Sequence, residues 1–119
     1  MIATTLVFGA SAAARERKIA TLLTPSSRAA LILEGFPDGK EINDLHEQFP
    51  HVGVQRIAPG CVCCTGNIVM RVTLNRVIKR NPDSLYLSIA SQGHTEQIKN
   101  FLSRPPYDAL LAIGKDLYA

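Results

Sequence analysis

TLVFGASAAARERKIATLLT, at residues 5–24, is the stretch from which the architecture of this chain follows. Residues 5–10 form a short apolar run, which predicts a buried strand. Ser11 comes next and can cap a helix over residues 12–24, where Ile19, Leu22 and Leu23 share one face through their i, i+3, i+4 spacing. A buried strand joined directly to an amphipathic helix predicts the first half of a βαβ unit.

The same alternation of strand and helix continues along the chain. Further apolar runs predict strands at residues 29–33, 52–57, 85–90 and 109–113, and helical spacing predicts helices at residues 41–49, 67–80 and 95–102. The apolar runs lack the alternation of half-exposed strands, so we expect them to be covered on both faces. The predicted fold is a three-layer α/β domain with a mostly parallel sheet of about five strands and helices on both faces.

Length and composition fit a single domain over residues 1–119. The 119 residues are 46% hydrophobic and 19% charged, which is enough for one buried core and too little for two. A net charge of +3 is far from the dense basic surface of a nucleic-acid binder, so we expect no nucleic-acid partner. No apolar run reaches the roughly 18 residues that cross a bilayer, so we expect no membrane partner either.

The three cysteines, Cys61, Cys63 and Cys64, lie within four positions between a Pro-Gly turn and a predicted helix. An odd, clustered set does not suit the disulfide framework of a secreted protein, so we expect a reducing, cytoplasmic location. Three thiolates can bind one zinc or cobalt ion and leave a coordination position open. Two other interpretations stay open: small buried hydrophobic residues, or a redox pair.

Parallel sheets of this kind bind ligands at the carboxyl ends of their strands. The segments that come after the predicted strands should therefore line one edge, and the cysteines are among them. Glu34 stands directly after an apolar strand on this edge and is the best candidate for a further metal ligand. Weaker candidates, each equally typical of a solvated surface, are Asp38, Glu41, His46, His51 and His94.

The run Gly60-Cys61-Val62-Cys63-Cys64, followed by a polar turn and an amphipathic helix, resembles the Gly-Cys-x-Cys-Cys motif of the CobW family of metallochaperone GTPases. Residues 6–17 fall where that family has its phosphate-binding P-loop, residues 33–36 resemble its acidic switch segment, and residues 86–93 resemble its Walker B strand. The resemblance implies a P-loop-NTPase-like fold and a metal site at the cysteines. The family's second domain has no counterpart in these 119 residues.

The nucleotide chemistry of that family is missing from this chain. A P-loop needs Gly-x-x-x-x-Gly-Lys-Ser/Thr, because its backbone amides wrap the phosphates, its Lys neutralises them and its hydroxyl holds Mg²⁺. Gly9 keeps the first position, but Ala14, Arg15 and Glu16 occupy the last three. Ala90 stands where the Walker B strand carries its acid. The resemblance therefore implies the fold and the metal motif without GTP hydrolysis.

Three functions remain as hypotheses. The first, which we favour, is a metal-binding accessory or chaperone-like protein, not an enzyme, that holds zinc or cobalt through the three cysteines and Glu34 and passes it to a recipient protein. The second is weak GTP binding or GTPase activity, with Gly9, Ser11 and Arg15 binding the nucleotide at a helix N-terminus. The third is a non-catalytic interaction module. The sequence leaves the metal and the oligomeric state open.

Overall fold

A computed structural model describes residues 1–35, 45–57, 68–90 and 95–119. Its strands are Ile2–Phe8 (β1), Ala29–Glu34 (β2), Gly53–Ile57 (β3), Ser84–Ile89 (β4), Leu111–Ile113 (β5) and Leu117–Tyr118 (β6). Its helices are Ala12–Ala20 (α1), Leu45–Gln48 (α2), Ile68–Lys79 (α3), Thr95–Leu102 (α4) and Tyr107–Leu110 (α5). Over the described ranges, no helix combines the length and the apolar character that a membrane span requires.

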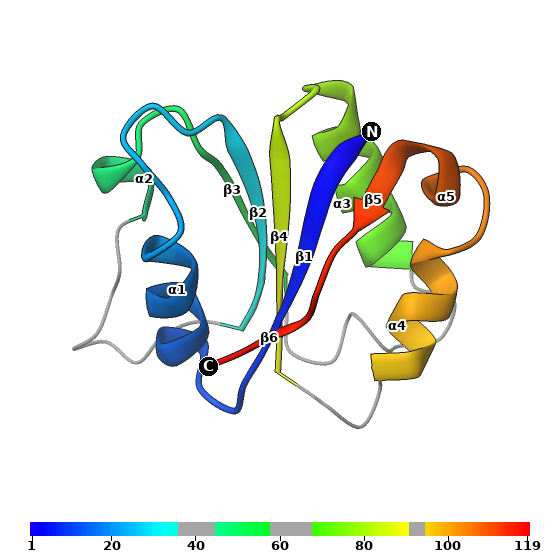
Figure 1. The fold of residues 1–119 in the computed structure, drawn as a ribbon, viewed down its shortest axis with the longest axis horizontal. Helices are drawn as coiled ribbons and strands as arrows, with labels where there is room; N and C mark the ends of the chain where they lie inside the picture. The colour runs from blue at the N-terminus through cyan, green and yellow to red at the C-terminus, as the bar shows by residue number, and fades with distance from the viewer. Residues whose placement is uncertain (36–44, 58–67, 91–94) are drawn as a thin grey trace.

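The strands form one parallel sheet in the order β3-β2-β4-β1-β5, as Figure 1 shows. The short strand β6 also pairs with β1 in parallel, at the end of β1 beyond β5. Crossovers join the strands from β1 to β5 in turn, because a parallel pair cannot be joined by a tight hairpin. The mostly parallel sheet with helices on both faces confirms the predicted fold class. Among the described strands, the two-residue strand β6 was not predicted, because it is too short to show a period.

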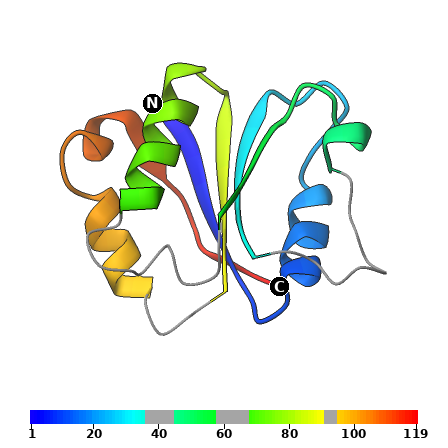
Figure 2. The ribbon, with the colours of Figure 1, turned by 180° about the vertical axis from the view of Figure 1, so that it is seen from behind.

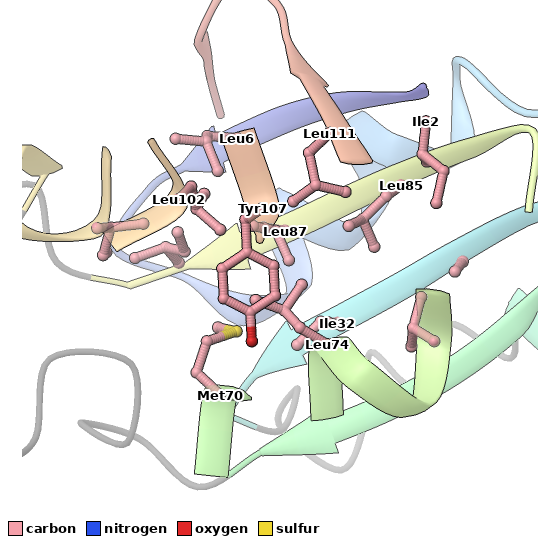
Figure 3. Close-up of a cluster of buried hydrophobic side chains, with 14 of the residues drawn as sticks. Ile2, Leu6, Ile32, Met70, Leu74, Leu85, Leu87, Leu102, Tyr107 and Leu111 are labelled. Atoms are coloured by element: carbon pink, nitrogen blue, oxygen red, sulfur yellow. The ribbon is translucent and has the colours of Figure 1, made fainter. Parts of the chain in front are cut away.

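Helices cover both faces of the sheet and divide the core into two clusters (Figure 1 and Figure 2). On one face, α3, α4 and α5 contribute Leu74, Leu102 and Tyr107. On the other face, α1 and α2 contribute Ile19 and Leu45. Figure 3 shows the first cluster, where side chains from these helices meet the apolar side chains of the sheet. Each such Leu or Ile contributes about 1.5–3 kcal/mol when it is fully buried.

Both ends of the chain depart from the predicted boundaries. Helix α1 ends at Ala20, four residues before Thr24, and Leu22 is 44% exposed where we predicted a core position. The helix stops because Leu22 N–H bonds to the Ile19 carbonyl and begins a tighter turn ahead of Pro25. Near the other end, the predicted strand at residues 109–113 is divided between α5 and β5, because Pro106 favours a helical turn first.

Several sequence predictions fall outside the described residues. They are the first part of the predicted helix at residues 41–49, the candidate ligands Asp38, Glu41 and His94, and all three cysteines. The predicted helix at residues 67–80 is present from Ile68 to Lys79. The described chain breaks off shortly after the carboxyl ends of β2, β3 and β4. These strands are neighbours in a parallel sheet, so their carboxyl ends lie on the same side of it.

Candidate functional site

The candidate site lies at the carboxyl ends of the central strands, where Arg15 reaches across from α1. Strand β4 lies between β1 and β2, and Ser88 near its end is level with Val7 on one side and Leu33 on the other. Ser11, just ahead of α1, accepts a hydrogen bond from the Ala14 N–H at 3.2 Å and so caps the helix. The cap fixes the first turn of α1, and Arg15 comes in the next turn.

Arg15 is a buried cation. Within the described residues, its guanidinium donates hydrogen bonds to acceptors in the interior of the fold. Its side chain is 1% exposed. Nε donates to Ser88 Oγ at 2.7 Å, Nη1 donates to the Gly9 carbonyl at 2.6 Å, and Nη2 donates to the Glu34 carbonyl at 2.6 Å. A buried charge is tolerated only when it is paired and hydrogen-bonded, and these three acceptors supply the bonds. Arg15 thereby ties the ends of β1, β2 and β4 to α1.

The space beside Gly9, the residue that follows β1, is filled by other atoms of this chain. A Cβ placed on Gly9 would lie 3.2 Å from both Arg15 Cγ and Ala119 Cβ. The Ala119 N–H donates to the Phe8 carbonyl at 2.8 Å, so the last described residues are held against the same loop. Gly9 therefore serves a close approach between chain segments, which a larger residue would disturb.

Glu34 supplies the negative charge at this edge. It is 2% exposed, and its Oε1 accepts a hydrogen bond from the Ala90 N–H at 2.7 Å. Burial lowers the pKa of the Arg15 guanidinium from its ordinary value, and the carboxylates of Glu34 and Glu16 act in the opposite direction. The Glu34 carboxylate thus both fastens the end of β2 to the end of β4 and offsets the buried charge of Arg15.

Glu16 forms a buried ion pair with Arg56. Its side chain is fully buried, and its two carboxylate oxygens accept hydrogen bonds from Nη1 and Nη2 of Arg56 at 3.0 and 2.9 Å. Arg56 is on β3, so this fork-to-fork pair joins α1 to the edge strand of the sheet. The charged side chains of Arg15 and Glu16 thus both make their hydrogen bonds within the fold.

The predicted site residues are only partly brought together. Gly9, Arg15 and Glu34 meet in one network, whereas Ser11 is exposed and its hydroxyl caps α1. His51 lies just before β3, at the opposite end of the sheet from Glu34, so the hypothesis that it joins this site is wrong. His46 is within α2, but its side chain is outside the described set.

The cysteine stretch is connected to this edge by described residues on both sides. Ile57, the last residue of β3, is paired in register with Glu34, and its carbonyl accepts a hydrogen bond from the Gly35 N–H at 2.9 Å. The described chain resumes at Ile68, the first residue of α3. The described chain therefore breaks off beside Glu34, at Ile57, before the stretch that includes the three cysteines.

Sequence reasoning missed two members of the site, Ser88 and Arg56. Ser88 is a small polar residue inside an apolar strand, and Arg56 is a charged residue on a strand with weak patterning. Neither pattern indicates which residue will be bonded, because Arg15 lies 73 positions from Ser88 and Glu16 lies 40 positions from Arg56 in the chain. Within the described ranges, no three His, Cys, Asp or Glu side chains gather closely enough to hold a metal ion.

Comparison with known proteins gives one informative match. Over 56 residues, 46% of this chain, the sequence is 34% identical to the zinc chaperone YeiR of Escherichia coli K12. The matched stretch covers 17% of that protein, so most of its length is not compared. No protein-family model matches the chain, and no solved structure matches it. Part of this chain is thus similar to a zinc chaperone.

Proposed function

We propose that this chain is a metal-binding accessory protein that holds zinc, or cobalt, through Cys61, Cys63 and Cys64 and releases it to a recipient protein. The observation that carries the proposal is the combination of three thiols in four residues with partial similarity to a zinc chaperone. Three thiolates suit zinc and leave one position for an exchanging ligand, as a carrier requires. The protein works as a binder and not as an enzyme.

The position of Glu34 at the end of the β2–β3 pair supports this proposal, because the chain continues from β3 toward the cysteines in sequence. The end of β3 lies beside Glu34, whose carboxylate is the nearest described negative group along that pair of strands. Oε1 of Glu34 accepts a hydrogen bond from the Ala90 N–H, so a metal ion would compete with the present contacts of this carboxylate. We therefore keep Glu34 in the proposed ligand set as a weak fourth donor, which a ligand of the recipient protein would displace from the exchangeable position.

The helix that comes after the cysteines supports contact with another protein. Ile68, Val69 and Val72, in the first turns of α3, are 66%, 44% and 51% exposed. Apolar residues gathered on one exposed helix surface are typical of interaction sites. In the proposal, this surface meets the recipient while the adjacent cysteines exchange the metal.

The contacts of Arg15 and Glu16 support a function without GTP hydrolysis. A nucleotide phosphate at the Gly9 loop would have to displace the guanidinium from three protein acceptors, or the Ala119 side chain from its contact. Glu16 adds a carboxylate where a hydroxyl would be needed for Mg²⁺. The proposal therefore assigns no role to nucleotide in metal binding.

The direct test is elemental analysis of reduced protein purified without chelator, compared with the triple variant Cys61→Ser, Cys63→Ser, Cys64→Ser. We expect close to one zinc per wild-type chain and a trace in the variant. A matched control is the exposed pair of substitutions Ser26→Ala and Ser103→Ala, which should leave the metal content unchanged. Equal, negligible metal in the wild type and the triple variant would remove the proposal.

Cobalt provides a second measurement on the same protein. Thiolate ligands give Co²⁺ intense charge-transfer absorption that oxygen ligands do not, so titration with Co²⁺ reports the ligand type directly. The absorption should saturate at one equivalent, disappear in the triple variant, and decline when Zn²⁺ is added. Saturation that persists in the triple variant would place the metal elsewhere.

A further inference from the structure

A second concave site lies at the opposite end of the sheet from the network around Arg15. It is a pocket of about 240 Å³, bounded by the start of β2, the start of β3 and the end of α3. Strand β2 has six residues, so its two ends are about 17 Å apart at about 3.3 Å per residue. The pocket is therefore separate from the proposed metal site.

Two arginines line this pocket from different elements. Arg28 precedes β2, and Arg80 comes directly after α3. Neither guanidinium has a hydrogen bond or an ion pair with another residue in the part of the chain that the structure describes. The described lining residues include no Asp or Glu, and Asp83, the nearest acid in sequence, lines a different cavity. Among the described residues, neither of the two arginines at the pocket is therefore paired with an acidic side chain.

Arg80 stands at the end of α3 and reaches the start of β3. Arg80 N–H and Asn81 N–H bond back to the carbonyls of Val77 and Ile78, and Asn81 takes a left-handed φ of 51°, which ends the helix in a tight turn. A Cβ placed on Gly53 would lie 3.6 Å from Nη1 of Arg80, so the guanidinium lies over the open surface of that glycine on β3. Arg80 therefore crosses from α3 to the start of β3.

The rest of the wall is apolar or uncharged. Its apolar surface comes from Pro50, which is exposed, and Pro82, which is partly exposed. Val52 and Val77 also line the pocket, but they are 1% and 2% exposed and offer a bound molecule almost no surface. Cations above apolar walls suit an anionic head group on an apolar body. The volume is at the small end of ligand pockets, which favours a molecule with one ring or a short chain.

We propose that this pocket binds a small organic anion, with a phosphate or carboxylate group held by Arg28 and Arg80 and an apolar body against Pro50 and Pro82. The negative end of the α3 dipole is close by, but the two full charges of Arg28 and Arg80 outweigh its partial charge of about half a unit. Such a site is independent of the cysteines, so it stands whether or not the chain carries metal.

The test measures binding of phenyl phosphate, benzoate and the neutral control benzyl alcohol by calorimetry at fixed ionic strength. Either anion should bind saturably and more tightly than benzyl alcohol, and the tighter anion identifies the preferred head group. The pair Arg28→Gln, Arg80→Gln should weaken that binding about tenfold or more, because charge-assisted hydrogen bonds are lost. The matched pair Arg76→Gln, Lys79→Gln removes the same amount of charge from α3 outside the pocket. It should change the dissociation constant of the anion less than about twofold.

A measurement on the wild type keeps the test independent of variant folding. In amide NMR spectra, the anion should shift the signals of Gly53 and Asn81 with the same saturation curve as the calorimetric titration. The inference is overturned if neither anion saturates, if benzyl alcohol binds equally well, or if both pairs of substitutions weaken binding alike. Shifts confined to residues outside the pocket would overturn it as well.

Discussion

Nε of Arg15 donates to Oγ of Ser88 across 2.7 Å, between residues 73 positions apart in the chain. The bond joins the second turn of α1 to the end of β4 in the middle of the sheet. Because the other guanidinium nitrogens bond to Gly9 and Glu34, one buried side chain holds three strand ends together. Parallel α/β sheets bind ligands at the carboxyl ends of their strands. In this protein the buried guanidinium of Arg15 occupies that position.

Replacing Arg15 with Ala should destabilise the protein by about 2–4 kcal/mol. The variant leaves a cavity and buried acceptors without their donor. Chemical denaturation with urea measures the free energy of unfolding. Lys18→Ala, an exposed substitution on the same helix, is the control and should stay within about 0.5 kcal/mol of the wild type. Similar losses in the two variants would mean that Arg15 contributes no more than helix propensity.

The pair between Glu16 and Arg56 should show strong energetic coupling. Glu16→Gln leaves the Arg56 guanidinium beside a buried neutral group. We therefore expect the free energy of unfolding to fall by about 2–4 kcal/mol. A double-mutant cycle with Arg56→Gln should give a coupling free energy of about 1 kcal/mol or more. The same cycle on Lys99 and Asp116, whose lysine is 45% exposed, should give a clearly smaller coupling. Coupling that is equal in the two cycles would contradict the importance of burial.

Tyr107 should make the stability of the protein sensitive to alkaline pH. Burial raises the pKa of its phenol above the ordinary value of about 10, and Arg71 acts in the opposite direction. With the pKa higher in the folded state, the stabilisation is fully present below pH 10 and is lost as pH rises from there through the raised pKa. Tyr107→Phe should therefore flatten the decline in unfolding free energy above pH 10. The variant also loses the hydrogen bond from Tyr107 to Asn75, so the two curves are compared by slope and not by height. Parallel curves would argue against the shift.

Titration with Mg²⁺ and GTP should give no saturable binding at submillimolar concentration. The Arg15 guanidinium is bonded inward, and the space beside Gly9 holds Ala119. Calorimetry checks this expectation, with ATP as a second nucleotide. Submillimolar binding of GTP that disappears in Arg15→Ala would instead promote the hypothesis of a nucleotide-binding protein. The variant's fold would be confirmed by circular dichroism in that case.

Single substitutions should rank the proposed metal ligands. Each of Cys61→Ser, Cys63→Ser and Cys64→Ser should weaken zinc about tenfold or more in competition with a chromophoric chelator, because a thiolate is replaced by a much poorer ligand. Glu34→Gln should have a smaller effect, since its Oε1 also bonds to Ala90. Glu96→Gln, on α4, is the matched acidic control. If Glu34→Gln lost more zinc affinity than every cysteine variant, the proposed ranking of the metal ligands would be reversed.

How far the sequence could predict the site is clearest for Ser11 and Arg15, which lie four residues apart. Ser11 caps α1 through the Ala14 amide, a local bond that results from the residue type and its place before the helix. From the sequence, Arg15 was a candidate to bind the phosphate of a nucleotide, and its burial could not be predicted. Its acceptors come from positions that lie together only once β4 has inserted between β1 and β2.

The sequence by itself determined the succession of strands and helices and the class of fold, because apolar runs and helical spacing are local properties that burial imposes on each segment. It also determined that three thiols occur together. Only the tertiary structure decided the pairing of Glu16 with Arg56, the inward bonds of Arg15, and the meeting of Arg28 with Arg80 at one pocket. These contacts depend on strand order and on packing between distant segments, which residue periodicity does not encode.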